Sequence, residues 1–307
     1  MATHELLLRQ RRYPFWYAAF CSVSDEKARM TQGLCALLDH LHESGVRLSP
    51  CLMDWASGNG VVLAAVAAHW RRIAKKPLHI LACDRESSFV SQTRAALAEA
   101  QVTSFEVLRL DTLRETLDAE ILGGQPIGIN LIAHLAYEAD DIHQLVMLGM
   151  EHLGRMGVAV FAHNRPTEDL RALGLAANSD LMLRADPELR QAFADLGVPY
   201  VMREWTSCLD IPPDVREEMC DASALMAQPS QLSLARALAE FLVERPLESL
   251  LEEGRLDAYV EALARWLNRS PGPLEMQGVF HIAALPDAEA EVLAALRGLQ
   301  QNEASVS

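Results

Sequence analysis

The first half of the chain alternates between short apolar runs and longer segments with the hydrophobic spacing of amphipathic helices. Five apolar runs predict strands, the first within Arg47–Ala56 and the others at Leu78–Asp84, Phe105–Asp111, Ile127–Ala133 and Val158–His163. The segments between them predict helices at Gly60–Ala74, Ser87–Ala100, Leu113–Leu122 and Asp141–Leu153. Strands that alternate with helices of this length predict an α/β fold with a doubly wound, mostly parallel sheet.

The alternation stops after His163, and the flanking parts of the chain are mainly helical. Residues 5–45 contain helical patterns and no strand pattern. Tyr200–Leu209 and Gln277–Leu285 predict two further strands, separated by a mostly helical segment over Val215–Asn268. Seven strands are therefore expected in all, with helical additions at the N-terminus and between the last two strands.

Three successive expected strands each end on an aspartate: Asp54, Asp84 and Asp111. The first of them is followed by a turn that contains Gly58 and Gly60 and leads into a helix. Open α/β sheets bind ligands at the carboxyl ends of their strands. A glycine-rich turn before a helix presents backbone N–H groups to such a ligand. The sequence therefore predicts a small-molecule site at this edge.

This arrangement resembles the class I S-adenosylmethionine (SAM) dependent methyltransferases. The resemblance covers about Leu48–His163 and implies a seven-stranded Rossmann-like sheet whose last two strands form an antiparallel pair. The expected organisation is an N-terminal helical lid (1–45), a SAM-binding core (46–165), helical insertions with the last strands (166–290) and a tail (291–307).

A nicotinamide-binding Rossmann unit is the main alternative, but the turn departs from its pattern. That fingerprint needs a third glycine, which lets the helix pack closely on the strand. Here Gly60 is followed by Val61, Val62 and Leu63. The acidic residue of the turn, Asp54, also precedes the glycines.

The resemblance assigns parts of SAM to individual side chains. Asp54 would bind the amino group of the methionine moiety, Asp84 the two ribose hydroxyls, and Asp111 with Thr112 the adenine. Helix capping is an alternative role for Asp84 and Asp111. Ala56 stands where the family usually has its first glycine. The complete set expected to bind the cofactor is Asp54, Trp55, Ala56, Gly58, Gly60, Asp84, Arg85, Asp111, Thr112 and His134.

The segment after the fourth expected strand resembles the histamine N-methyltransferase group of small-molecule methyltransferases. His134 would lie beside the sulfonium or the acceptor, where a histidine can act as a general base. Tyr137 would line the same pocket, although core packing is an alternative. Many members of the group have Asp where Asn130 stands. His163 and Asn164 end the next strand, either as pocket residues or as part of a simple turn.

Aromatic residues cluster near the N-terminus, over Tyr13–Phe20. Family members often place an N-terminal helix over the cofactor, and aromatic faces attract a desolvated cation such as the sulfonium. We therefore expect this segment to form a lid, with Trp16 and Tyr17 facing the pocket. A helix that packs on the core, or a homodimer contact, is the alternative. Tyr17, His134, Tyr137 and Asn164 form the expected catalytic set.

Charge and composition narrow the choice of partners. The 42 acidic residues outnumber the 27 basic ones, which gives a net charge of −15. Proteins that follow a nucleic-acid backbone need a basic face, so small molecules are favoured as substrates over nucleic acids. No apolar run approaches the roughly 20 residues of a membrane span. The six scattered cysteines predict a reducing, cytoplasmic setting, and no metal site is expected.

Methyl transfer to a small amine, acid or hydroxyl compound is the default expectation. The same scaffold is used by cyclases similar to the azetidine-2-carboxylate synthases, in which the amine of SAM displaces methylthioadenosine. Asn130, Tyr137 and Asn164 would then lie near that amine. A non-catalytic SAM-binding scaffold is a third alternative.

Overall fold

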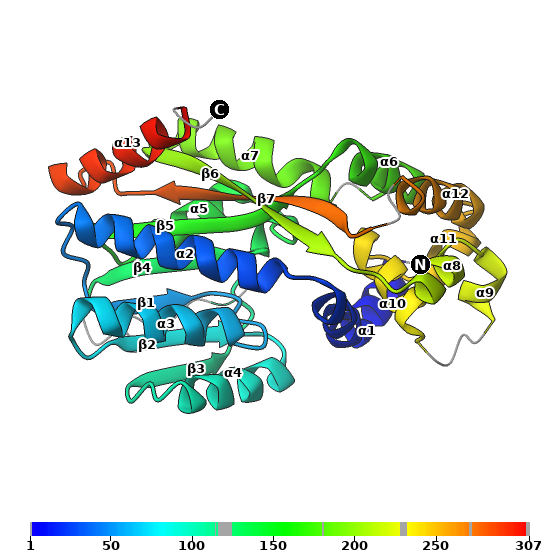
Figure 1. Cartoon of the computed structure of the whole chain (residues 1–307), viewed down its shortest axis with the longest axis horizontal. Coiled ribbons are helices and arrows are strands. Elements are labelled where there is room, and N and C mark those ends of the chain that lie inside the picture. Colours follow the sequence, from blue (N-terminus) through cyan, green and yellow to red (C-terminus); the bar gives the residue numbers. More distant parts are fainter. Residues whose placement is uncertain are drawn as a thin grey trace. The chain divides into compact units, whose positions relative to one another are not determined.

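The computed structural model describes residues 2–113, 115, 125–179, 181–227, 232–269 and 272–304 (Figure 1). The chain forms two compact units, and each is built from separate stretches of sequence. Unit 1 comprises Met1–Glu26, Asn164–Arg184 and Thr206–Gln277. Unit 2 comprises Lys27–His163, Ala185–Trp205 and Gly278–Ser307.

Seven strands among the described residues form one sheet in the order β3-β2-β1-β4-β5-β7-β6. Their bounds are β1 Cys51–Asp54, β2 His79–Asp84, β3 Phe105–Arg109, β4 Ile127–Ala133, β5 Leu153–Arg165, β6 Tyr200–Leu209 and β7 Leu274–Ala283. Strands β3, β2, β1, β4 and β5 pair in parallel. The expected doubly wound, mostly parallel sheet is therefore confirmed.

Strand β7 runs antiparallel to both of its neighbours. The Ala284 N–H, just after β7, donates to the carbonyl of Pro199, just before β6, at 3.1 Å. The Glu289 N–H donates to the carbonyl of Arg155, at the start of β5, at 3.0 Å. The end of β7 thus lies beside the beginnings of β5 and β6. The antiparallel pair expected at the end of the sheet is present.

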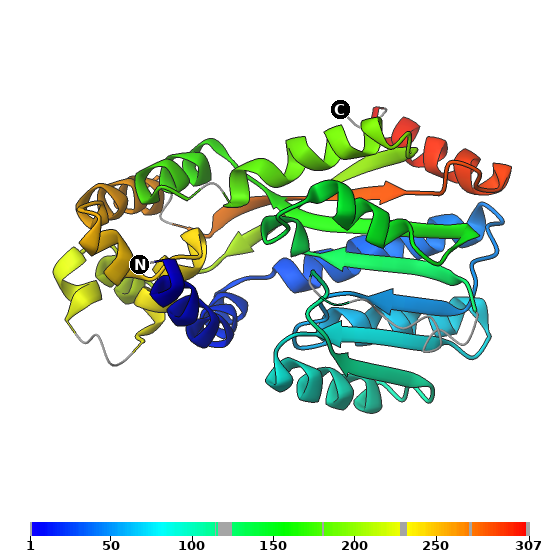
Figure 2. The same ribbon diagram turned by 180° about the vertical axis from the view of Figure 1, so that it is seen from behind.

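Helices cover both faces of the sheet in unit 2 (Figures 1 and 2). One apolar cluster joins the strands to α2 Glu26–Glu43, α3 Val61–Ala74, α4 Ser87–Glu99 and α13 Ala290–Ala304. The opposite face packs on α5 Ile142–Met150 and α7 Leu181–Asp195. Phe161 of β5 meets Phe193 of α7 edge to face there, with ring centroids 5.3 Å apart. Side chains alternate between the faces along a strand, so residues 161 and 163 of β5 share the α5 and α7 face.

Unit 1 is built mainly from helices around a second apolar cluster. Its helices are α1 Ala2–Val23, α6 Glu168–Ala177, α8 Pro213–Met219, α9 Ala222–Met226, α10 Leu234–Val243, α11 Leu247–Glu252 and α12 Leu256–Leu267. Phe20 of α1 stacks on Phe241 of α10 with ring centroids 4.5 Å apart. Helices α8 to α12 are the helical segment expected between the last two strands.

Partly buried ion pairs hold α1 within unit 1. Arg12 donates to Glu240 at 2.7 Å and to Glu248 at 2.8 Å. The indole of Trp16, which is fully buried, donates to Glu240 at 2.7 Å. Arg236 donates to the same two carboxylates. The contacts of Trp16 are thus core contacts, in place of the pocket-facing position expected for it. A lid formed by Tyr13–Phe20 stays a prediction.

Some expected boundaries differ from the structure. Residues 1–26 group with unit 1 and the remainder of the expected lid, residues 27–45, with unit 2. Most of the expected tail forms α13, because Val292, Leu296 and Leu299 are apolar and buried against the core. The helix expected over 113–122 lies, apart from Leu113 and Glu115, outside the described residues. Within the described ranges, no helix combines the length and apolar composition that a membrane crossing requires.

Candidate functional site

The carboxyl edge of the parallel strands brings Asp54 and Asp84 to the same glycine-rich turn. Asp54 is the last residue of β1 and Asp84 the last of β2, its neighbour in the sheet. The Asp84 carboxylate accepts hydrogen bonds from the N–H groups of Gly58 and Glu86, both at 2.9 Å. Each of its oxygens therefore carries one bond from the protein and keeps a lone pair for a ligand.

The turn itself is held by α4. Gly58 and Gly60 have φ angles of 54° and 74°, which glycine adopts without strain. The Thr93 hydroxyl of α4 donates to the Gly58 carbonyl at 2.9 Å. A Cβ on Gly60 would lie 2.6 Å from the Thr93 Cα. Thr93, which is fully buried, was not among the residues expected at the site. Thr93 lies in α4, 33 positions beyond Gly60 in the sequence, and no sequence motif indicates that it contacts the turn.

Burial changes the acidity of both aspartates. Desolvation raises the pKa of Asp54 to about 7, against the smaller opposing effect of a hydrogen bond from the Ala56 N–H. Desolvation likewise raises the pKa of Asp84 to about 6, although the N–H groups of Glu86 and Gly58 favour its ionised form. A ligand that offers positive charge or hydrogen-bond donors would stabilise both carboxylates.

Trp55, expected to contact the cofactor, and Asn130, placed near the SAM amine only in the cyclase alternative, form a buried hydrogen-bonded pair. The Trp55 ring is buried, and its Nε1 donates to the Asn130 side-chain oxygen at 2.5 Å. The Asn130 amide donates in turn to the Gly149 carbonyl at 2.8 Å, at the end of α5. The backbone N–H of Trp55 is also used, by the Leu131 carbonyl at 3.0 Å. Asn130 is fully buried, so it joins β4 to β1 and α5.

The third acidic position, Asp111, is partly exposed. Asp111 follows β3, and its N–H donates to the Glu115 carboxylate at 3.1 Å. The neighbouring Thr112 hydroxyl donates to the Trp55 carbonyl at 2.7 Å. The Thr112 side chain thus supports the turn after β1. Its expected cofactor contact, and that of Asp111, stay predictions.

Arg85 and His134 lie where β2 and β4 end. The Arg85 guanidinium forms a two-pronged ion pair with Glu138, and one of the two hydrogen bonds measures 3.0 Å. His134 has a φ of 59°, an uncommon value for a residue with a side chain. Its N–H donates to the Ala162 carbonyl at 2.8 Å, which holds this conformation. Uncommon backbone angles of this kind occur often at functional sites.

Tyr137 lies next to His134. The residues from Leu135 to Tyr137 form a short 3₁₀ helix, η1, and the Tyr137 ring stacks on that of His134 with centroids 5.8 Å apart. Tyr137 is buried and His134 half-buried. His134 can therefore face a ligand at this edge, with Tyr137 behind it.

Tyr17 and Asn164 belong to unit 1, whereas His134 and Tyr137 belong to unit 2. Asn164 is buried and donates to the buried Glu26 carboxylate at 2.7 Å. Tyr17 stacks on Tyr13, one turn earlier in α1, with centroids 6.3 Å apart. A joint catalytic role for these four residues stays a prediction.

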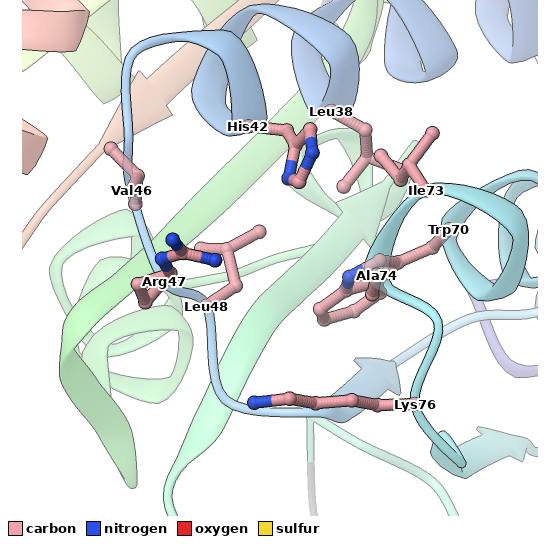
Figure 3. A pocket seen from close by; sticks show the side chains of 9 residues that line it. All are labelled: Leu38, His42, Val46, Arg47, Leu48, Trp70, Ile73, Ala74 and Lys76. Atoms are coloured by element: carbon pink, nitrogen blue, oxygen red, sulfur yellow. The ribbon is translucent and has the colours of Figure 1, made fainter.

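A cavity of about 90 Å³ lies at the opposite edge of the sheet (Figure 3). Leu48 just before β1 and Lys76 just before β2 place it at the amino ends of the strands. Figure 3 shows that the polar side chains of His42, Arg47 and Lys76 line the cavity together with apolar side chains, which include Trp70. This cavity is therefore distinct from the edge that carries Asp54 and Asp84.

Comparison with known proteins found similarity to solved structures only. No family model matches the chain, and no curated protein does. A SAM-dependent methyltransferase from Geobacter sulfurreducens, solved with S-adenosyl-L-homocysteine, is 16% identical, with 83% of this chain and 90% of that chain covered and a TM-score of 0.47. A putative methyltransferase from Bacillus halodurans is 13% identical, with coverage of 81% and 97% and a TM-score of 0.49.

A putative sarcosine dimethylglycine methyltransferase from Galdieria sulphuraria is 11% identical, with 82% of this chain and 85% of that chain covered and a TM-score of 0.46. Since these values indicate distant likeness, the residues at the carboxyl edge of the sheet carry the functional argument. They form a candidate small-ligand site on a doubly wound α/β sheet.

Proposed function

We propose that the chain binds SAM and transfers its methyl group to a small-molecule acceptor. The observation that carries the proposal is the Asp84 carboxylate, fixed by the N–H groups of Gly58 and Glu86 at the end of β2. Both of its oxygens keep a free acceptor direction, which suits the two neighbouring hydroxyls of a ribose. The glycine turn beside it gives the ligand close access to the backbone.

Asp54 supports SAM over a nicotinamide dinucleotide. Its side chain is 3% exposed, and burial raises its pKa to about 7. The ammonium of a methionine moiety would complement this carboxylate through charge-assisted hydrogen bonds. A nicotinamide dinucleotide has no ammonium group to offer. The third glycine of the dinucleotide fingerprint is also missing.

His134 and Tyr137 favour an acceptor site at the end of β4. SAM supplies an electrophilic methyl group, and its transfer is an in-line displacement that depends mainly on positioning. The half-buried His134 can accept a proton from an amine or hydroxyl acceptor. Tyr137 fixes the imidazole by stacking at 5.8 Å. The net charge of −15 supports a small molecule over a nucleic acid.

The cyclase alternative has less support, because Asn130 is committed to Trp55 and Gly149. Incubation of the purified chain with SAM alone, followed by mass spectrometry, separates the alternatives. Methyl transfer predicts S-adenosylhomocysteine after a metabolite extract is added, and little product before. Methylthioadenosine with a cyclic amino acid, formed from SAM alone, would instead identify a cyclase. SAM binding with no product under either condition would identify a scaffold, and NAD binding without SAM binding would exclude all three.

Binding of SAM is expected to release protons between about pH 5 and pH 7. The pKa of Asp54 is raised to about 7 in the free protein, so the group is mostly protonated at pH 6. An ammonium ligand favours the carboxylate and lowers this pKa. Affinity should therefore increase as the pH rises toward 7 and then level off. Calorimetry at pH 6 in two buffers of different ionisation enthalpy measures the released protons directly.

Asp54→Asn is the control for this linkage, because an amide of similar shape cannot titrate. We expect the variant to bind SAM more weakly and to release fewer protons. Proton release that is unchanged in Asp54→Asn would assign the linkage to another group, such as Asp84.

A further inference from the structure

Three buried side chains meet on the α5 and α7 face of the sheet in unit 2. They are His163 near the end of β5, His281 in β7 and Asp186 in α7. One ligand atom from each lies within 4.8 Å of the other two. His281 Nε2 is 3.0 Å from Asp186 Oδ1, and His163 Nε2 is 3.9 Å from the same oxygen. The two imidazole rings are stacked with centroids 5.1 Å apart.

Within the described residues, three nitrogen atoms of the two histidines have no hydrogen-bond partner. Both histidines have an exposed fraction of 0%. Neither nitrogen of His163 has a hydrogen-bond partner there, and Nδ1 of His281 has none either. Buried polar atoms almost always have a partner. His163 Nε2, which lies 3.9 Å from the Asp186 carboxylate without a hydrogen bond, therefore points to a missing partner that accepts an electron pair.

We propose that His163, Asp186 and His281 bind one divalent transition-metal ion of the zinc or iron(II) class. Two imidazoles and one carboxylate suit these ions, whereas magnesium and calcium prefer sites made only of oxygen. Ligand atoms about 2.1 Å from a tetrahedral ion lie about 3.4 Å apart. The observed separations of 3.0 and 3.9 Å fall on either side of this value.

The charges of the three groups fit a cation. Neutral imidazole is the form of histidine that binds metals. The buried Asp186 carboxylate would supply a negative charge that a divalent ion offsets.

Aromatic rings pack around the site and connect it to the candidate acceptor site at the end of β4. Phe193 and Tyr200 pack on His281 with ring centroids 5.8 and 5.7 Å away. Tyr137 meets His163 edge to face at 6.3 Å and stacks on His134. A bound ion would therefore join β5 and β7 to α7 directly behind Tyr137. This inference is independent of the proposed methyl transfer.

Metal binding by the full-length chain tests the proposal. The protein is stripped with a chelator and then titrated with Zn²⁺ or with Co²⁺, whose visible absorption reports its coordination. We expect one ion per chain, with His163→Ala and His281→Ala each weakening binding by more than about 100-fold, beyond the usual effect of outer-shell changes. His143→Ala is the matched control, because His143 also pairs with an aspartate, Asp195, but is exposed.

The alanine variants could lose the ion because they do not fold, so Asp186→Asn is a second test. An asparagine keeps the size and hydrogen bonding of the side chain. It should lose the ion while retaining the wild-type circular dichroism. Absence of stoichiometric binding by the wild-type chain would overturn the proposal. Binding that His143→Ala weakens as much as His163→Ala does would overturn it too, because it would place the ion at the surface.

Discussion

Replacing Asp84 with alanine is expected to weaken SAM binding by about 10- to 100-fold. Loss of the acceptor for a buried ribose diol costs about 1–3 kcal/mol, and each 1.4 kcal/mol corresponds to about a tenfold change in affinity. The same change removes the acceptor for the N–H groups of Gly58 and Glu86, so the turn also loses its anchor. Isothermal titration calorimetry with SAM and with S-adenosylhomocysteine measures the loss.

Two further variants separate the causes of this effect. Asp84→Asn keeps one oxygen that can accept from the backbone, so its loss of affinity should be intermediate. Asp257→Asn removes an exposed carboxylate in α12 and should leave the affinity unchanged. Wild-type affinity in Asp84→Ala would contradict the role of Asp84 and, with it, the proposed cofactor.

The second large effect is expected for Gly60→Ala, on stability as well as on binding. The new Cβ would lie 2.6 Å from the Thr93 Cα, a backbone atom that cannot move without α4. Overpacking of this kind costs about 1–3 kcal/mol. The φ of 74° adds about 1 kcal/mol for a residue with a side chain. Urea unfolding should show the combined loss as a lower midpoint.

Gly45→Ala is the matched control, because Gly45 has a similar φ of 81° but a Cβ there would have no atom of another segment within 4 Å. It isolates the backbone cost, so its destabilisation should be about 1 kcal/mol. Equal losses in the two variants would show that the contact with Thr93 does not constrain the turn.

Local patterns were sufficient to predict the sheet and the edge that carries the candidate site. Strands β1 and β2 are apolar runs that are each followed by a helix, and the carboxyl ends of parallel strands occupy one edge by geometry alone. Asp54, Asp84 and the glycine turn could therefore be placed together from the sequence. The expected antiparallel last strands came from the family resemblance, and the structure contains them.

These local patterns could not predict contacts between residues that lie far apart in the sequence. The cyclase alternative placed the polar Asn130 near the amine of SAM, but its partners Trp55 and Gly149 fix it in the core. His163, Asp186 and His281 are separated by 23 and 95 positions, far from any metal-binding spacing. Only the pairing of β5 with β7, covered by α7, brings them together.

The discontinuous construction of unit 1 has a consequence for how the chain folds during synthesis. Helix α1 is synthesised before its partners Glu240 and Glu248, which are made only after all of β1 to β6. Closing so long a loop is slow, and an unpaired amphipathic helix exposes apolar surface meanwhile. Trp16 and Phe20 would remain exposed until α10 emerges. Nascent chains that end before Leu234 should therefore hold α1 as an accessible chaperone-binding segment, which the completed chain hides.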